Sequence, residues 1–181
     1  MRLSFSLVSL SLPLFFFLLC FHGVNGVDIT KPTCKKAAKS DLKLKYSFCL
    51  KSLKANPKSQ NANLQELGIL STELAITNAN STSSYIKNLL KKNQKRVDNK
   101  YLKDCLELYT DAIPDLQEVL EAFKSRDYFK ANIQMSSAMD ASSTCEDGFK
   151  EKKGLVSPLT KKNNDFFQLT AIALAITNLV H

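Results

Sequence analysis

The sequence predicts an all-α protein, in which a short N-terminal helical hairpin precedes a four-helix bundle. Residues 27–181 contain only three glycines and four prolines, and so few helix breakers favour long helices. Four long segments repeat apolar residues in alternating steps of three and four, which is the spacing of one helix face. Helices that each carry one apolar stripe can bury those stripes against one another in a bundle.

An apolar leader, residues 1–26, precedes this domain. Arg2 is followed by an apolar run from Leu7 to Phe21, and small or modest residues lead up to Gly26. This pattern predicts a secretory signal peptide that is cleaved after Gly26. The alternative is an uncleaved membrane anchor, but the run is shorter than the roughly 20 residues that a span needs. Residues 27–181 are therefore expected to be one exported domain, free of the membrane.

The first part of the domain, residues 27–56, is expected to be a hairpin of two helices. Residues 42–48 alternate apolar and polar side chains, which is a strand pattern. However, no second strand is evident, and a lone strand would leave its backbone groups unpaired. We therefore predict a short helix over Lys31–Ala38, a turn, and a second helix from about Tyr46 to Lys54.

The second part, residues 60–181, contains the four periodic segments. They cover residues 69–90, 105–123, 128–149 and 159–180. Asp127 can cap the third segment, and Ser157 followed by Pro158 is typical of an N-cap with proline at the first helical position. Pro114 lies inside the second segment and predicts a kink there, because it cannot donate a hydrogen bond to the Thr110 carbonyl. Residues 91–100 are polar and are expected to form a connection or a frayed helix end.

The last segment is apolar nearly all round between Leu169 and Ile176. It could be a membrane tail or a lipid-anchor signal, but it is short for a span, and no small-residue cleavage site followed by a polar spacer precedes it. A buried bundle helix is the favoured interpretation.

Four cysteines remain after the leader, which takes Cys20 with it. An even set of cysteines in an exported chain predicts a disulfide framework. We expect Cys34–Cys49 to close the N-terminal hairpin and Cys105–Cys145 to join two bundle helices. The loop-entropy model assigns these bonds about 3 and about 4 kcal/mol. No thiol would then remain free for catalysis.

The residues that most enzymes need are missing, so we expect no catalytic residue, no metal site and no cofactor. The one histidine of residues 27–181 is His181, at the chain terminus, which makes it a poor general base. Acidic pairs three residues apart, such as Glu118 with Glu121, are ordinary on helix surfaces. The sequence favours a binding protein instead. Asn80-Ser81-Thr82 is the only glycosylation sequon, so Asn80 is a candidate for a glycan if exposed.

The net charge limits which classes of partner are expected. Residues 27–181 contain 24 basic and 17 acidic side chains, a formal charge of +7. Such a protein could be attracted to an acidic polysaccharide such as pectin, or to an acidic partner. A generic lysine-rich surface explains the charge equally well. Nucleic acid is not expected, because the chain is exported and carries no nucleic-acid-binding motif.

The cysteines and their flanks resemble one family. Its members share an opening hairpin similar to Tyr46–Leu50, a third-cysteine helix similar to Leu102–Ala112, and a fourth-cysteine segment similar to Thr144–Phe149. On these residues the chain resembles the plant invertase and pectin methylesterase inhibitors. Residues 153–169 are most similar to the branch called "putative invertase inhibitors", which includes pollen allergens.

The resemblance implies an up-and-down four-helix bundle with an N-terminal helical hairpin, in which the first cysteine pairs with the second and the third with the fourth. It also implies inhibition by protein–protein binding, without a cofactor. Invertase inhibitors of the family place a Pro-Lys-Phe motif, between two bundle helices, in the invertase site. The matching positions here are Tyr128, Phe129 and Lys130, which keep an aromatic residue and a lysine but lack the proline. With Asp127 they are the candidate contact residues; alternatively, Tyr128 and Phe129 belong to the core, since Tyr128 lies on the apolar stripe.

The leading hypothesis is therefore a secreted inhibitor that occludes the active site of a plant cell-wall or vacuolar acid invertase. Pectin methylesterase is the alternative target. A helical carrier of a small apolar ligand and a secreted signal protein are alternatives from other classes. The expected location is the apoplast or cell wall, with the vacuole as a second option, and the expected state is a monomer.

Overall fold

The computed structural model describes residues 27–92 and 98–180, and all regular structure in these residues is helical. This confirms the predicted all-α fold class. The leader, the signal-peptide prediction, most of the connection near residue 95 and His181 lie outside the described residues. The helices are α2 Thr30–Ser40, α3 Tyr46–Lys54, a 3-10 helix Pro57–Asn61, α4 Leu64–Lys92, α5 Asn99–Ser125, α6 Tyr128–Lys150 and α7 Thr160–Thr177.

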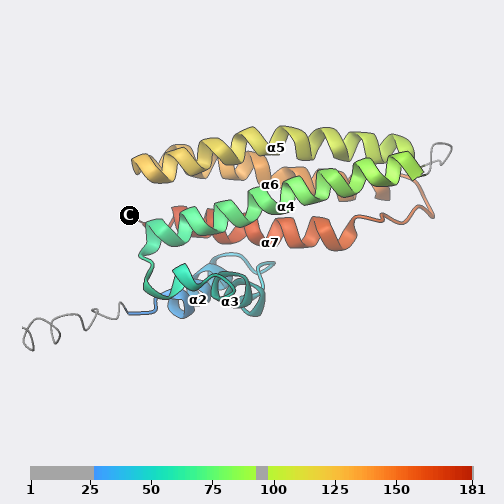
Figure 1. The fold of residues 1–181 in the computed structure, drawn as a ribbon. Helices are drawn as coiled ribbons and strands as arrows, with labels where there is room; N and C mark the ends of the chain where they lie inside the picture. The colour runs from blue at the N-terminus through green and yellow to red at the C-terminus, as the bar shows by residue number, and fades with distance from the viewer. Residues whose placement is uncertain (1–26, 93–97, 181) are drawn as a thin grey trace, which may run out of the picture.

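The four long helices form an up-and-down bundle. They lie side by side and alternate in direction, and each packs on two neighbours, in the order α4, α5, α6, α7 and back to α4 (Figure 1). The start of α4, the α5–α6 turn and the C-terminus therefore meet at one end of the bundle. The α6–α7 link lies at the opposite end.

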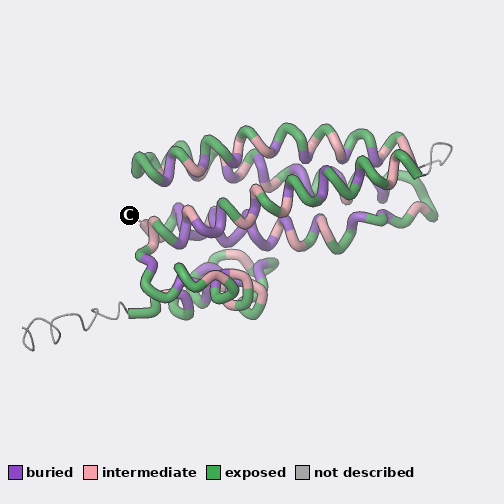
Figure 2. Tube along the Cα trace, in the orientation of Figure 1, coloured by how far each residue is buried: buried purple, intermediate pink, exposed green. Residues whose placement is uncertain are grey.

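The buried residues lie mainly on the sides of these helices that face the other helices of the bundle (Figure 2). The predicted stripe of α5 is confirmed, since its members are all buried: Cys105, Tyr109, Ala112, Leu116, Val119 and Phe123. The stripe predicted for α4 is partly wrong. Ile69 and Ile76 are only half-buried, whereas Gly68, Ser71 and Ala75 are buried. The face of α4 that points inward is thus shifted by about one position from the predicted stripe. Leu67 and Leu70 supply large buried side chains on it, and the small residues at Gly68, Ser71 and Ala75 let α4 approach its neighbours closely.

α7 is the most buried helix, and its apolar segment 169–176 is part of the bundle core, in agreement with the favoured interpretation of that segment. Eleven of its residues are buried, including Phe166, Ile172 and Ile176. Among the residues that the structure describes, no helix is both long and apolar enough to cross a membrane.

The hairpin of α2 and α3 packs on α7 and, more lightly, on α4. The Cys34–Cys49 disulfide joins its two helices, with Cα atoms 5.7 Å apart. Gln168 of α7 fixes the turn between them: its amide accepts a hydrogen bond from the Lys45 N–H and donates one to the Lys43 carbonyl, both at 2.8 Å. The alternating residues near 44 thus form a turn and the start of a helix, because α7 satisfies the backbone groups that a strand would have left unpaired.

The second disulfide, Cys105–Cys145, joins α5 to α6 with Cα atoms 4.9 Å apart. α4 begins with a cap that was not among the predicted ones. Asn63 and Glu66 form a reciprocal capping box at the start of α4, at 2.8 and 3.0 Å. α5 runs through Pro114 as one continuous helix, and the kink stays a prediction.

The N-terminus predicted for α7 is shifted. The regular helix begins at Thr160, whereas Pro158 was expected to be its first residue. The Ser157 hydroxyl still accepts a hydrogen bond from the Leu159 N–H at 3.1 Å. Ser157 therefore caps an irregular first turn that precedes the helix.

Candidate functional site: the α5–α6 turn

α5 ends in a tight backbone turn at Arg126. The Arg126 N–H donates to the Phe123 carbonyl at 3.2 Å, and the Asp127 N–H donates to the Ala122 carbonyl at 2.8 Å. These two bonds define a Schellman motif, which usually places glycine at the left-handed position. Here that position is Arg126, with φ 62°, the one non-glycine residue with positive φ among those described. The predicted Asp127 cap places a break between the two helices here, but the sequence does not indicate the Schellman geometry, because the usual glycine is absent.

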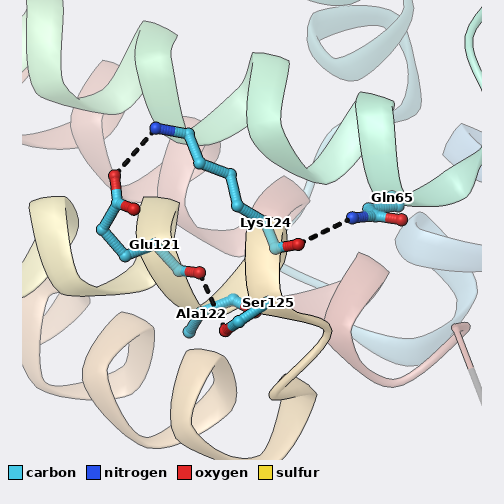
Figure 3. Close-up of polar contacts among 5 residues, drawn as sticks. All are labelled: Gln65, Glu121, Ala122, Lys124 and Ser125. Carbon is cyan, nitrogen blue, oxygen red and sulfur yellow. Dashed lines mark hydrogen bonds and ion pairs between the residues drawn. The ribbon is translucent and has the colours of Figure 1, made fainter.

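A third helix holds the turn in place. Gln65, in the first turn of α4, donates its side-chain amide to the Phe123 carbonyl at 2.8 Å. The same amide lies 3.5 Å from the Lys124 carbonyl, to which it also donates (Figure 3). The Ser125 hydroxyl donates to the Glu121 carbonyl at 2.9 Å. The carbonyls of Ala122 and Phe123, which the helix leaves without an internal partner, are therefore satisfied by the N–H groups of the turn, and Gln65 adds side-chain hydrogen bonds to Phe123 and Lys124.

α6 begins directly after this turn, as predicted. The Asp127 carboxylate accepts a hydrogen bond from the Lys130 N–H at 3.0 Å and caps the helix. The half-buried ring of Tyr128 packs edge-on against the ring of Phe123, with centroids 6.0 Å apart. Tyr128 therefore anchors the turn to the core, and its predicted place on the apolar stripe agrees with this contact.

Phe129 points outward and is 77% exposed. The alternative that Phe129 belongs to the core is therefore wrong. Ile133, one helical turn further along α6, is 52% exposed. Since positions four apart share a helix face, these two side chains form an apolar patch beside the turn. Ile133 was not a candidate in the sequence, although its spacing from Phe129 could have indicated it.

The charged side chains next to Phe129 are also held in place. The Lys130 ammonium lies 3.1 Å from a carboxylate oxygen of Glu118 on α5, and the Gln134 amide donates to the same oxygen at 2.7 Å. The hydrogen bond from Gln134, followed by the interaction with Lys130, lowers the pKa of Glu118. Lys130 is thus tied to α5, and its charge has a defined position beside the patch.

The structure brings all four candidate contact residues onto one exposed corner of the bundle. We call this corner the contact turn: residues 126–130 together with Ile133. Its geometry suits binding rather than catalysis, because it combines an exposed aromatic side chain with a rigid, hydrogen-bonded backbone. Asn80 lies elsewhere, exposed on α4, where its amide donates to the Ile76 carbonyl at 3.0 Å.

The buried polar groups of the bundle are structural. The Tyr109 hydroxyl donates to the Asn163 side chain at 2.9 Å, and the Asn163 amide donates to Glu146 at 2.7 Å. Burial, with smaller contributions from the Glu146 and Asp165 charges, raises the pKa of Tyr109. Within residues 27–92 and 98–180, no group of three or more His, Cys, Asp or Glu side chains could hold a metal ion.

Three comparisons place this architecture among known proteins. The family model described as plant invertase/pectin methylesterase inhibitor matches residues 28–176. A "putative invertase inhibitor" from Platanus acerifolia is 50% identical over 182 residues, covering 99% of each chain. Pectinesterase inhibitor 12 from Arabidopsis thaliana is 37% identical and covers 84% of this chain and 87% of its own. The crystal structure of a mutant form of a pectin methylesterase inhibitor from Arabidopsis superposes with a TM-score of 0.68 at 27% identity, covering 80% of this chain and 97% of that one.

The helical bundle and the exposed contact turn define a helical protein with a preorganised corner that suits the binding of a partner. The chain belongs to the plant invertase/pectin methylesterase inhibitor family. Members of this family are named as inhibitors of enzymes and not as enzymes.

Proposed function

We propose that this protein is an exported inhibitor of a plant acid invertase and that the contact turn forms part of its enzyme-binding surface. The observation that carries the proposal is Phe129, which is 77% exposed in the first turn of α6. The turn before it is held by the hydrogen bond between Gln65 of α4 and the Phe123 carbonyl of α5. The Platanus relative at 50% identity is named for invertase, which supports this target over pectin methylesterase.

The proposed action is occlusion of the substrate site, which needs no covalent chemistry. An exposed aromatic ring on a rigid turn can fill a pocket at little entropic cost, because its backbone is already ordered. Asp127 and Lys130 lie beside the ring and would contribute charge complementarity at the rim of the interface. The Schellman turn, the Gln65 contacts and the Glu118–Lys130 pair would all serve to preorganise this corner.

The test is an inhibition assay with the purified protein and an acid invertase. Phe129→Ala should raise the inhibition constant about 30-fold, the loss of a hot-spot contact of roughly 2 kcal/mol. Val156→Ala is the matched control, because Val156 is 82% exposed and lies in the α6–α7 link at the opposite end of the bundle. Equal inhibition constants for the two variants would show that the contact lies elsewhere.

The same assay with pectin methylesterase examines the alternative target. Inhibition of that enzyme, with no loss of invertase activity at acidic pH, would replace the first proposal.

The carrier hypothesis is less well supported. A carrier needs an enclosed apolar cavity, whereas the cleft of about 470 Å³ between α6 and α7 opens to solvent and has the charged side chains of Glu146 and Asp147 in its wall. A signal protein would leave both enzymes fully active.

The remaining expectations belong to the same proposal. The protein would lose residues 1–26 on export to the cell wall, or alternatively reach the vacuole, and act as a monomer. Residues 27–181 would be one domain, with a hairpin over 27–56 and a bundle over 60–181. Asn80 would be the glycan site, if a glycan is attached. The formal charge of +7 after export favours a weak attraction to acidic pectin.

A further inference from the structure

The net charge of the domain is concentrated in its N-terminal hairpin and the 3-10 helix that follows it. Residues 27–61 contain nine lysines, no arginine and two aspartates, which gives a formal charge of +7. Residues 62–181 contain fifteen basic and fifteen acidic side chains and are formally neutral. The whole excess of positive charge therefore sits in about a fifth of the chain.

All nine of these lysines are exposed. Lys31, Lys35 and Lys39 follow one another at intervals of four residues along α2, so they form a row on one flank of the helix, about 12 Å long at 1.5 Å per residue. The opposite face of α2 is buried and carries Thr33, Cys34 and Ala37. Folding thus turns the lysines of α2 outward.

The protein does not neutralise this charge itself. Among the described residues, Lys54 is the one lysine of the hairpin in an ion pair, with Asp28 at 3.5 Å. The first turn of α2 has no acidic residue, and Lys31 stands there against the helix dipole. Like charges four residues apart on a helix repel each other. Lys39, in the last turn, is favoured by the helix dipole, but Lys31 and the like-charge repulsion along the row oppose helix stability, so the row as a whole gives α2 little net stabilisation.

We propose that the outer face of the hairpin, with the row Lys31, Lys35 and Lys39 at its centre, is a docking surface for a polyuronate: pectin chains whose carboxylates are not esterified. Charge complementarity selects this partner, because a row of ammonium groups matches a polymer with regularly repeated carboxylates. Lysine suits a dispersed polyanion, whereas paired recognition of phosphate favours arginine. The hairpin exposes Val27, Leu42 and Tyr46 outside α2, but the face of α2 that carries the lysine row has no large apolar side chain, whereas a membrane-surface helix needs an apolar face.

This surface is separate from the contact turn. The hairpin packs on α7 and α4, whereas the contact turn joins α5 to α6 (Figure 1). One side of the molecule can therefore hold the wall polymer while the contact turn engages an enzyme. The inference goes beyond the proposed inhibition and does not depend on which enzyme is inhibited.

The experiment measures binding of the full domain, residues 27–181, to unesterified polygalacturonate by titration calorimetry at low and high salt. The test variant is Lys31→Glu, Lys35→Glu, Lys39→Glu. The matched control is Lys87→Glu, Lys91→Glu, Lys103→Glu, which makes the same change in net charge with exposed lysines of the bundle. Circular dichroism and the inhibition assay, run in free solution, verify that both variants are folded.

The expected result is an affinity about tenfold lower for the hairpin variant, a change of twofold or less for the control, and loss of the difference in high salt. Both variants should inhibit the enzyme with the same inhibition constant as the unchanged protein. Equal weakening by the two variants would overturn the proposal, because net charge alone would then explain the binding. The proposal would also be overturned by equal binding to fully methyl-esterified pectin, or by tighter binding to duplex DNA or to phosphatidylserine vesicles.

Discussion

Gly68 of α4 lies directly against the ring of Phe123 of α5. A Cβ atom at position 68 would lie 2.2 Å from Phe123 Cε1 and 2.5 Å from Cζ, so only glycine allows this approach. The same Phe123 accepts hydrogen bonds from Gln65 and Arg126 through its carbonyl and packs on Tyr128 through its ring. Gly68 therefore sets the position of the residue on which the contact turn is built.

Gly68→Ala should destabilise the protein by about 1–3 kcal/mol, the usual cost of overpacking a core, although alanine is the better helix former. The matched control is Gly148→Ala. A Cβ at Gly148 meets only Tyr101 at 4.0 Å, so this change should stabilise α6 by about 0.5–1 kcal/mol. Urea unfolding of both variants measures the two effects. A gain in stability for both would mean that the Phe123 ring moves aside freely.

Arg126→Gly should stabilise the turn. Arg126 holds φ 62°, which costs an L-residue about 1–2 kcal/mol, and glycine recovers part of this despite its larger chain entropy, a net gain of about 0.5 kcal/mol. Arg126→Ala removes the same side chain but keeps the backbone penalty, so it should show no such gain. Thermal unfolding compares the two. Equal gains would place the strain in the arginine side chain and not in the backbone.

Tyr109→Phe should cost about 1–3 kcal/mol, because it leaves the Asn163 side-chain oxygen without its hydrogen bond. Asn163 is 3% exposed, so little water can replace the lost donor. Tyr101→Phe is the control. The Tyr101 ring is half-buried, and its centroid lies 5.6 Å from that of the Phe149 ring. Phenylalanine keeps this contact, so Tyr101→Phe should change the free energy of unfolding by no more than about 0.5 kcal/mol. Chemical denaturation gives both values.

Cys105→Ser should destabilise the protein far more than Asn80→Gln. The first change opens the α5–α6 disulfide, which closes a loop of sequence separation 40, and should cost about 4 kcal/mol in the loop-entropy model. Asn80 is exposed on α4, so its loss should cost no more than about 0.5 kcal/mol. Differential scanning calorimetry compares the two midpoints, and equal midpoints would contradict the prediction.

The ion pair between Lys130 of the contact turn and Glu118 of α5 should persist from about pH 5 to 7. The pKa of Glu118 is lowered from 4.5 by its bonds to Gln134 and Lys130. A group with a lowered folded pKa contributes its stability fully above the unfolded pKa and loses it as the pH falls through the folded pKa. The midpoint difference between Glu118→Gln and the unchanged protein should thus be constant from about pH 5 to 7 and disappear at lower pH.

Histidine should have no part in the pH response. His181 is the one histidine of residues 27–181, so any change in inhibition between about pH 5 and 7 should come from carboxylates or from the enzyme. Inhibition curves of the protein with and without residue 181 test this. Loss of the pH response on deletion of His181 would assign the effect to that residue.

The sequence alone was enough to predict the helices. Periodicity and capping are local properties, so they predicted α3 at Tyr46–Lys54 and the Asp127 cap of α6, both of which the structure shows. The cysteine order with its flanks indicated the family and the disulfide partners. Local rules were less successful at the start of α7, where Ser157 caps an irregular turn ahead of the helix.

Only the tertiary structure decided which face of each helix is buried. Ile69 and Ile76 fit a stripe as well as their smaller neighbours do, but the close approach of α5 at Gly68 turns the small face inward. Likewise, Phe129 and Tyr128 are adjacent aromatics in the sequence. Packing on Phe123 holds the ring of Tyr128 against the core and leaves Phe129 in solvent. Burial depends on neighbours that are distant in sequence, and no local pattern contains them.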